Sequence, residues 1–190
     1  MYIYPCMNLS QLFQQRLSLS ENQSDKGTAH TYIDSYYNQK FTPLKDESFN
    51  LLEIGVQNGY SVSLWREFFS KAMIYAIDMN DCPVCRKFSN VKFYSVDGYC
   101  QTTLDMFEDN FFDIIIEDGP HNVESQIYAT KEWTRKLKVG GVLAIEDIQD
   151  ASSVPLIQSA APSNVESVFY DFRKNNGRWD NMIVELTRKY

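Results

Sequence analysis

The chain has 190 residues, of which 44% are hydrophobic and 23% charged, and its formal net charge is −7. This length suits one domain, and the 12 Tyr, 12 Phe and 3 Trp residues argue against a disordered chain. The acidic balance of 25 Asp and Glu against 18 Lys and Arg argues against nucleic acid as the main partner, because phosphate binding needs a basic surface.

No targeting or membrane segment is expected. Residues 1–5 show no basic region followed by a long apolar run, so we expect no signal peptide. No apolar run approaches the roughly 18 residues that a membrane span needs. The four cysteines, Cys6, Cys82, Cys85 and Cys100, are too few for a disulfide scaffold. These features favour a cytoplasmic protein that binds neither membranes nor nucleic acid.

Two regions with different patterns follow one another along the chain. Residues 1–48 are polar and Tyr-rich, with one weak helical pattern at Leu9, Leu12, Phe13 and Leu17. Residues 49–190 alternate short apolar runs with amphipathic stretches. Strands are predicted at 49–54, 73–77, 91–96, 112–116 and 142–145, with helices at 62–70 and 124–137.

Strands that alternate with helices predict a parallel sheet with right-handed crossovers. Two final strands, at 165–172 and 181–187, are separated by a linker too short for a helical crossover, so we expect them to pair antiparallel. The prediction is therefore an α/β fold of seven strands, mostly parallel, with one antiparallel C-terminal hairpin.

Glycine or acidic residues follow each of the five parallel strands. In chain order these are Gly55, Asp78, Asp97, Glu117 with Asp118, and Glu146 with Asp147. Ligands of open α/β sheets bind beyond the carboxyl ends of the strands. Carboxylates gathered there repel one another unless they bind a ligand or share a cation. This edge is the predicted site.

The first turn, Glu53–Ser61, has the pattern Glu-x-Gly-x-x-x-Gly and differs from the pyrophosphate fingerprint Gly-x-Gly-x-x-Gly. Glycine lets the backbone turn tightly and approach a ligand closely. Asp78, after the second strand, can accept hydrogen bonds from both hydroxyls of a ribose. The turn and Asp78 together favour a nucleoside site, and the alternative is a plain strand–helix turn with a solvated aspartate.

With these motifs, residues 49–190 resemble the class I S-adenosylmethionine-dependent methyltransferases, which have a Rossmann-like sheet. The resemblance implies that the first turn wraps the methionine part of the cofactor, that Asp78 binds the ribose and that Asp97-Gly98 borders the adenine. The cofactor-binding residues that it implies are Glu53, Gly55, Gln57, Gly59, Ser61, Asp78, Asp97, Gly98 and Asp118.

Asp118, Glu146 and Asp147 follow neighbouring strands and can converge as three oxygen ligands for Mg²⁺. His121 lies near Asp118 and could remove the proton of a substrate hydroxyl. The alternative is that the three acids are helix N-caps and that His121 is an ordinary loop residue.

This second motif resembles the metal-dependent sugar O-methyltransferases that modify macrolide and aminocoumarin sugars. The resemblance implies that Asp118, Glu146 and Asp147 ligate the metal and that His121 is the base. The segment 24–32 is similar to a stretch that precedes the core in glycan-tailoring relatives, where it could cover the cofactor or line the acceptor pocket. Pro120 departs from the family pattern, and so does the absence of the long N-terminal region of the macrolide enzymes.

We therefore expect an S-adenosylmethionine- and Mg²⁺-dependent O-methyltransferase of a sugar or nucleotide sugar. One alternative acceptor is a catechol, although that family carries Asp-Asn and Lys where this chain has Glu146-Asp147 and His121. A nicotinamide-dependent oxidoreductase and a non-catalytic methyltransferase-like subunit are further alternatives. Residues 1–48 form either a pocket wall or an oligomer contact, and a homo-oligomer is compatible with the sequence.

Three other features are expected to be structural. Cys82 and Cys85 lack a second ligand pair for zinc and do not open a thioredoxin-like helix, so they are interpreted as part of a loop. His30 is expected to pack or to form hydrogen bonds. The tyrosine cluster, Tyr32, Tyr36 and Tyr37, favours core or lid packing over stacking on a sugar.

Overall fold

The protein is described by a computed structural model that covers residues 7–19 and 24–190. The expectations for residues 1–5 and for Cys6 lie outside these ranges. None of the helices within the described ranges is long and apolar enough to cross a membrane.

Seven strands form one sheet in the order β3-β2-β1-β4-β5-β7-β6. Their bounds are β1 Asn50–Ile54, β2 Met73–Asp78, β3 Val91–Ser95, β4 Phe112–Glu117, β5 Leu137–Ile145, β6 Val165–Asp171 and β7 Met182–Arg188. The strands from β3 to β5 pair in parallel, whereas β7 is antiparallel to both β5 and β6. The predicted fold class is confirmed.

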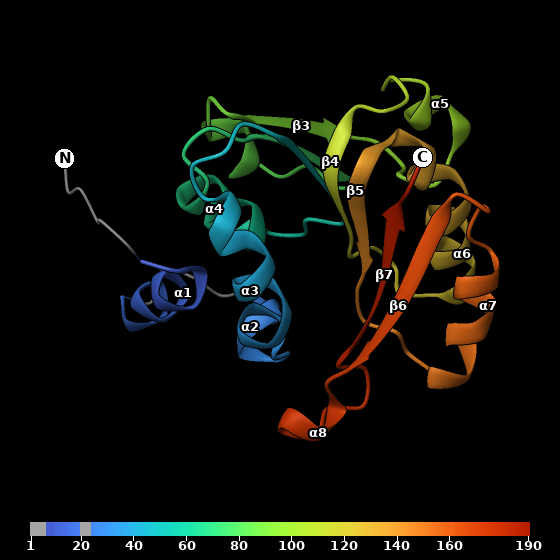
Figure 1. The fold of residues 1–190 in the computed structure, drawn as a ribbon. Coiled ribbons are helices and arrows are strands. Elements are labelled where there is room, and N and C mark those ends of the chain that lie inside the picture. Colours follow the sequence, from blue (N-terminus) through green and yellow to red (C-terminus); the bar gives the residue numbers. More distant parts are fainter. Residues whose placement is uncertain (1–6, 20–23) are drawn as a thin grey trace.

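Helices cover both faces of the sheet (Figure 1). On one side lie α1 Leu9–Ser18, α2 Asp25–Thr28, the π-helical turn Ile33–Tyr37, α3 Asn38–Phe41 and α4 Tyr60–Phe68. The other helices are α5 Gln101–Leu104, α6 Val123–Glu132, α7 Val154–Ser159 and α8 Arg173–Asn176. In Figure 1, α6 and α7 flank the opposite side of the sheet, and α8 lies at the tip of the β6–β7 hairpin.

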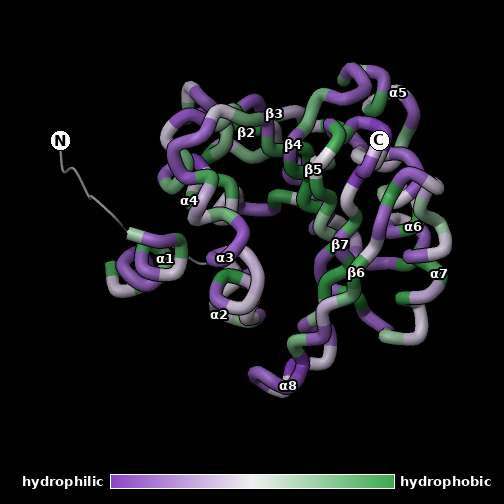
Figure 2. The backbone as a smooth tube through the Cα atoms, viewed as in Figure 1, coloured by the Kyte–Doolittle hydropathy of each residue, from purple (hydrophilic) through white to green (hydrophobic). Residues whose placement is uncertain are grey.

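The strands are apolar on both faces because each face packs against helices. In β1, Leu51 belongs to one buried cluster, and its neighbours Leu52 and Ile54 belong to the other. In Figure 2 the central strands carry long hydrophobic stretches, whereas the surrounding helices and loops are largely hydrophilic. The N-terminal helices share the first cluster through Phe13 and Tyr37, so the segment before β1 packs on the same core.

The helix predicted at 124–137 is confirmed as an α-helix only as far as Glu132, and its last residue, Leu137, belongs to a strand. α6 ends at Glu132, a 3₁₀ turn follows, and β5 begins at Leu137. The pairing of β4 with β5 jumps from Phe112↔Leu137 to Ile114↔Val142, so residues between them bulge out. Gly140 makes this bulge with a φ of +81°, a conformation that glycine adopts without steric cost.

The parallel register brings the ends of three central strands together. Ile54 of β1 pairs with Glu117 of β4, and Glu117 pairs with Ile145 of β5. The residues that follow these ends, Gly55, Asp118 and Glu146, therefore lie side by side. The hydrogen bond from Asp118 N to Ile54 O, at 2.8 Å, extends the pairing beyond the strand.

Candidate active site

A cavity of about 440 Å³ opens at the carboxyl ends of the strands. It is large enough for a small ligand, since such pockets hold roughly 300–1,000 Å³. Of the residues that the sequence assigns to a cofactor, six line it: Gly55, Gln57, Ser61, Asp78, Gly98 and Asp118. His121 lines the same cavity, whereas Glu146 and Asp147 are not among its lining residues, so the second predicted motif reaches this space through Asp118 and His121.

Asp78 holds the first turn in its conformation. Its Oδ2 accepts hydrogen bonds from the backbone N–H groups of Val56 and Gln57, at 2.9 and 2.8 Å. Its Oδ1 accepts a further bond from Asn80 N at 2.8 Å. Asp78 therefore joins the loop after β1 to the loop after β2 and presents a carboxylate at the cavity wall.

Three residues that the sequence assigns to the cofactor do not line the cavity. Glu53 is fully buried, and its Oε2 accepts a hydrogen bond from Trp65 Nε1 at 3.0 Å. Gly59 caps α4 with a φ of +75°. Asp97 is exposed, and its Oδ1 accepts a bond from Tyr99 N at 2.9 Å. These three residues therefore lie next to the cavity and contact its surroundings, but they do not form its wall.

Gly55 lies where β1 meets the loop after β4. Its φ is +84°, and a Cβ there would overlap the carbonyl oxygen and carbon of Asp118. Relief of this overlap would require the backbone that carries Asp118 to move. The turn and the acidic loop can therefore be this close only because residue 55 has no side chain.

This contact predicts a large loss of stability for Gly55→Ala. Gly140→Ala is a matched control, because Gly140 has a φ of +81° but nothing within 4 Å of an added Cβ. We expect Gly140→Ala to lower the free energy of unfolding by about 1–2 kcal/mol, the ordinary penalty of the left-handed conformation. Gly55→Ala should cost several kcal/mol more in urea unfolding, and equal losses would contradict the proposed close approach.

Cys82 and Cys85 pack beneath the first turn. Their sulfur atoms are 3.0 Å apart, and both would contact a Cβ placed on Gly59. Burial raises the pKa of Cys85, which keeps the thiol protonated. Within the described ranges, the side chains that lie close enough together to hold a metal ion include no cysteine. The structure thus supports the interpretation of this motif as a loop.

His121 faces two carboxylates. Its Nε2 is 3.9 Å from Asp118 Oδ1 and 3.7 Å from Asp147 Oδ2, and its side chain is 30% exposed. His121 and Asp147 both have a positive φ, of 55° and 54°. Non-glycine residues adopt this conformation rarely, and such residues gather at functional sites. The backbone strain thus coincides with the predicted catalytic residues.

A lysine that the sequence analysis did not single out lies within the acidic cluster, which consists of Glu53, Asp118, Glu146 and Asp147. Lys26, from α2, is only 1% exposed. Its Nζ lies 2.5 Å from Asp118 Oδ2, 2.6 Å from Glu146 Oε2 and 3.3 Å from Glu53 Oε1. Burial by itself would lower the pKa of Lys26, but these three carboxylates outweigh burial and raise it well above its ordinary value. Lys26 is therefore a charged, buried ammonium.

Glu146 is engaged on both carboxylate oxygens. Oε2 accepts a hydrogen bond from Lys26, and Oε1 accepts a short bond from the hydroxyl of Tyr37. The side chain is 1% exposed, and burial raises the pKa of the Glu146 carboxyl well above its ordinary value. Glu146 thus points into the protein, on the side of Lys26, whereas Asp147 points toward His121.

Asp147 is held from its other side by the N-terminal segment. Its Oδ1 accepts a hydrogen bond from Tyr32 OH at 2.8 Å and lies 3.1 Å from His30 Nε2. The ring of His30 stacks on Tyr32, and Arg178 Nε donates to His30 Nε2 at 2.7 Å. Burial and then Arg178 lower the pKa of His30, although Asp180 opposes them. His30 is therefore an uncharged hydrogen-bonding residue of the core.

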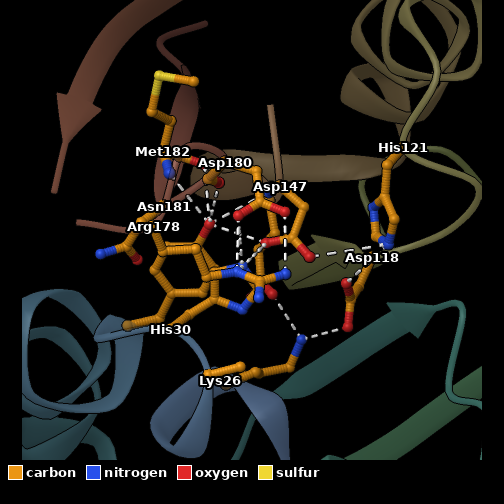
Figure 3. A network of polar contacts seen from close by, with 12 residues as sticks. Lys26, His30, Asp118, His121, Asp147, Arg178, Asp180, Asn181 and Met182 are labelled. Atoms are coloured by element: carbon orange, nitrogen blue, oxygen red, sulfur yellow. Dashed lines mark hydrogen bonds and ion pairs between the residues drawn. The ribbon is translucent and has the colours of Figure 1, made fainter. Parts of the chain in front are cut away.

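In Figure 3, dashed lines join Asp118 to Lys26 on one side and to His121 on the other. Asp118 thus has one oxygen on the buried ammonium and the other facing the histidine. Asp118, His121 and Asp147 each place one ligand atom within 4.8 Å of the others. Mg²⁺ prefers oxygen ligands, so the carboxylate oxygens of Asp118 and Asp147 that face His121 fit the predicted metal.

The helix-cap alternative is wrong for these acids. The N-cap of α6 is Asn122, whose side chain accepts a hydrogen bond from Ser125 N at 2.8 Å. The helical turn after β5 is capped by Asp150. Asp118, Glu146 and Asp147 therefore lie at the sheet edge without serving the helices that follow.

Residues 52–148, more than half of the chain, match a family described as a methyltransferase domain. The chain belongs to this methyltransferase family. Its fold is the one that the sequence resemblance implied.

The methyltransferase has curated relatives among the O-methyltransferases of Streptomyces. It is 30% identical over 146 residues to the 8-demethyl-8-alpha-L-rhamnosyl tetracenomycin-C 2'-O-methyltransferase of Streptomyces olivaceus, covering 72% of this chain and 38% of that one. It is 28% identical over 134 residues to the demethylmacrocin O-methyltransferase of Streptomyces fradiae, covering 66% and 33%. The chain spans about a third of the length of these relatives.

Solved structures with the same fold include MycE, a methyltransferase from the mycinamycin biosynthetic pathway, in complex with Mg and SAH. The TM-score is 0.73 at 19% identity, and the match covers 96% of this chain and 55% of MycE. A pre-rRNA processing protein, the fibrillarin of Methanococcus jannaschii, matches less well, with a TM-score of 0.58 at 17% identity. These likenesses support the fold of the methyltransferase.

The tyrosine cluster of the methyltransferase contacts acidic residues at and near the site through its hydroxyl groups. Tyr32, Tyr36 and Tyr37 are buried, and their hydroxyls donate to Asp147, Glu185 and Glu146. Their rings are thus covered by the core. The similarity of the segment 24–32 to glycan-tailoring relatives was the sequence signal that could have placed Lys26 and Tyr32 at the site, since both contact the acidic cluster.

Proposed function

We propose that this chain is an S-adenosylmethionine-dependent O-methyltransferase that acts, with a divalent cation, on a hydroxyl of a sugar or glycan precursor. The observation that carries the proposal is the single cavity that joins the glycine turn and Asp78 to Asp118 and His121. The names of the curated relatives support the reaction class, because each names an O-methyltransferase and two of them name a rhamnosyl or an olivosyl compound.

The methyl donor would bind along the first turn. Gly55 and Gln57 bring backbone close to the ligand, and Gly98 and Ile77 line the wall beside them. The carboxylate of Asp78 would accept hydrogen bonds from the ribose hydroxyls. The sulfonium would then lie toward Asp118, at the end of the cavity that His121 also lines.

Asp78→Asn is expected to weaken the binding of S-adenosylhomocysteine by about tenfold or more, because a hydrogen bond to a charged group contributes roughly 1.5–3 kcal/mol. Calorimetric titration measures the loss. Asp81→Asn is the matched control, since Asp81 follows the same strand but pairs with exposed Arg86. Equal affinities for both variants would contradict a ribose role for Asp78.

The acceptor hydroxyl would bind between His121 and the acidic pair. Asp118 and Asp147 would hold the divalent cation, which when bound lowers the pKa of a hydroxyl that it contacts. His121 Nε2 faces both carboxylates and is positioned to take the hydroxyl proton as a general base. The deprotonated oxygen then attacks the methyl group in line with the departing thioether sulfur. Fixed positions of donor and acceptor supply much of the rate.

The acceptor class is tested by methyl transfer from labelled S-adenosylmethionine to a panel of compounds. The panel holds rhamnosides, nucleotide-activated deoxysugars and a catechol, each with Mg²⁺. We expect a labelled methyl ether on a sugar and none on the catechol. Transfer to the catechol with no transfer to any sugar would overturn the proposed acceptor class in favour of the catechol-type reaction.

A further inference from the structure

We propose that Lys26 is a positioning residue that reserves Glu146 for a buried ion network, so that the divalent cation binds through Asp118 and Asp147 and without Glu146. This inference rests on the proposed function, because it assigns the ligands of the same site. It differs from the sequence expectation, in which all three acids ligate the metal.

The first support is the state of the Glu146 carboxylate. One oxygen lies 2.6 Å from the ammonium of Lys26, and the other accepts the hydroxyl of Tyr37. Lys26, Tyr37 and Glu146 are each at most 1% exposed. Both oxygens are therefore held by donors that solvent does not reach.

The second support is the direction of the other two acids. Asp118 gives only Oδ2 to Lys26, and its Oδ1 faces His121 at 3.9 Å. Asp147 gives Oδ1 to Tyr32 and turns Oδ2 toward His121 at 3.7 Å. Each thus keeps one oxygen toward His121, which lines the cavity. The group of potential ligands that contains His121 includes these two acids and leaves out Glu146.

The third support is electrostatic. A cation that took Glu146 as a ligand would approach the ammonium of Lys26 and compete with it for the same oxygen. Lys26 is 1% exposed and also contacts Glu53, so its ammonium is held by a further carboxylate within the protein. A buried ammonium that loses its partners is strongly unfavourable. The arrangement therefore favours a metal on the Asp118 and Asp147 side with Lys26 in place.

The test is Mn²⁺ binding to chelator-treated protein, followed by the electron paramagnetic resonance signal of free Mn²⁺. Two isosteric variants are compared with the wild type, Glu146→Gln and Asp147→Asn. Removal of a ligand should weaken Mn²⁺ binding by more than about a hundredfold, whereas loss of an outer-shell charge should weaken it by no more than about 10–100-fold. We expect Asp147→Asn in the first class and Glu146→Gln in the second.

A double variant tests the part played by Lys26. In a Lys26→Met background Glu146 is released, so Glu146→Gln should there weaken Mn²⁺ at least about tenfold more than it does in the wild type. Lys136→Met is the control, because Lys136 is also buried but pairs with Asp109 outside the cavity. Titration with S-adenosylhomocysteine reports whether each variant keeps its cofactor pocket.

Equal losses for Glu146→Gln and Asp147→Asn would overturn the inference and leave the proposed function standing. A wild type that binds no Mn²⁺ would overturn both the inference and the metal part of the proposed function. If Lys26→Met fails to fold, the comparison of the two isosteric variants decides by itself.

Discussion

Replacing His121 with alanine is expected to reduce methyl transfer by about 10²–10⁴-fold, the usual contribution of a positioned general base. The imidazole is the group on the cavity wall that lies within 4 Å of both Asp118 and Asp147 and can accept a proton near them. The measurement is the rate of transfer of labelled methyl to the acceptor at saturating donor.

The control for this variant is binding. His121→Ala should bind S-adenosylhomocysteine with nearly unchanged affinity, because the turn that we propose binds the donor is anchored by Asp78 and not by His121. Retained turnover with retained binding would show that another group, or water, takes the proton. Loss of both would instead indicate that His121 shapes the cavity.

Lys26→Met is expected to lower the free energy of unfolding by about 3–5 kcal/mol, because it leaves buried carboxylates without their cation. Lys40→Met is the matched control. Lys40 also pairs with a glutamate, at 2.5 Å from Glu185, but its side chain is 34% exposed. A partly exposed pair contributes only about 0–1 kcal/mol. Urea unfolding measures the free energy of unfolding of both variants. Similar losses would contradict the claim that Lys26 stabilises the buried carboxylates.

The edge of the sheet that carries the site could be predicted because it depends on strand order alone. Once five parallel strands are recognised, Asp78, Asp118 and Asp147 must emerge at one edge. The antiparallel hairpin followed from a linker too short to cross over. The start of β5 was missed, because Gly140 in a bulge has the same appearance in sequence as a glycine that ends a helix.

The cation inside the acidic cluster could not be predicted in the same way. Lys26 lies 92 residues before Asp118 and 120 before Glu146, so no local pattern connects them. A lysine next to Asp25 near the end of a polar segment is typical of a solvated surface. What places Lys26 in the core is the packing of the N-terminal helices on the first buried cluster, where Phe13 and Tyr37 lie against the sheet side chains.

The orientation of each carboxylate likewise could not be predicted from the spacing of residues along the chain. Glu146 and Asp147 are adjacent in the sequence, and both emerge from the end of β5. The positive φ of Asp147 separates their directions, so that Glu146 turns toward Lys26 and Asp147 toward His121. Spacing along a chain can therefore predict which acids meet, whereas their partners decide which oxygen faces a ligand.

The central claim is that Asp118 and Asp147 hold a divalent cation beside the methyl group that is transferred. The most direct measurement is methyl transfer to the accepted sugar after treatment with EDTA, followed by addition of Mg²⁺. We expect EDTA to abolish turnover while S-adenosylhomocysteine still binds, and excess Mg²⁺ to restore the rate. Full turnover of metal-free protein, in a sample shown to lack divalent ions, would contradict this account.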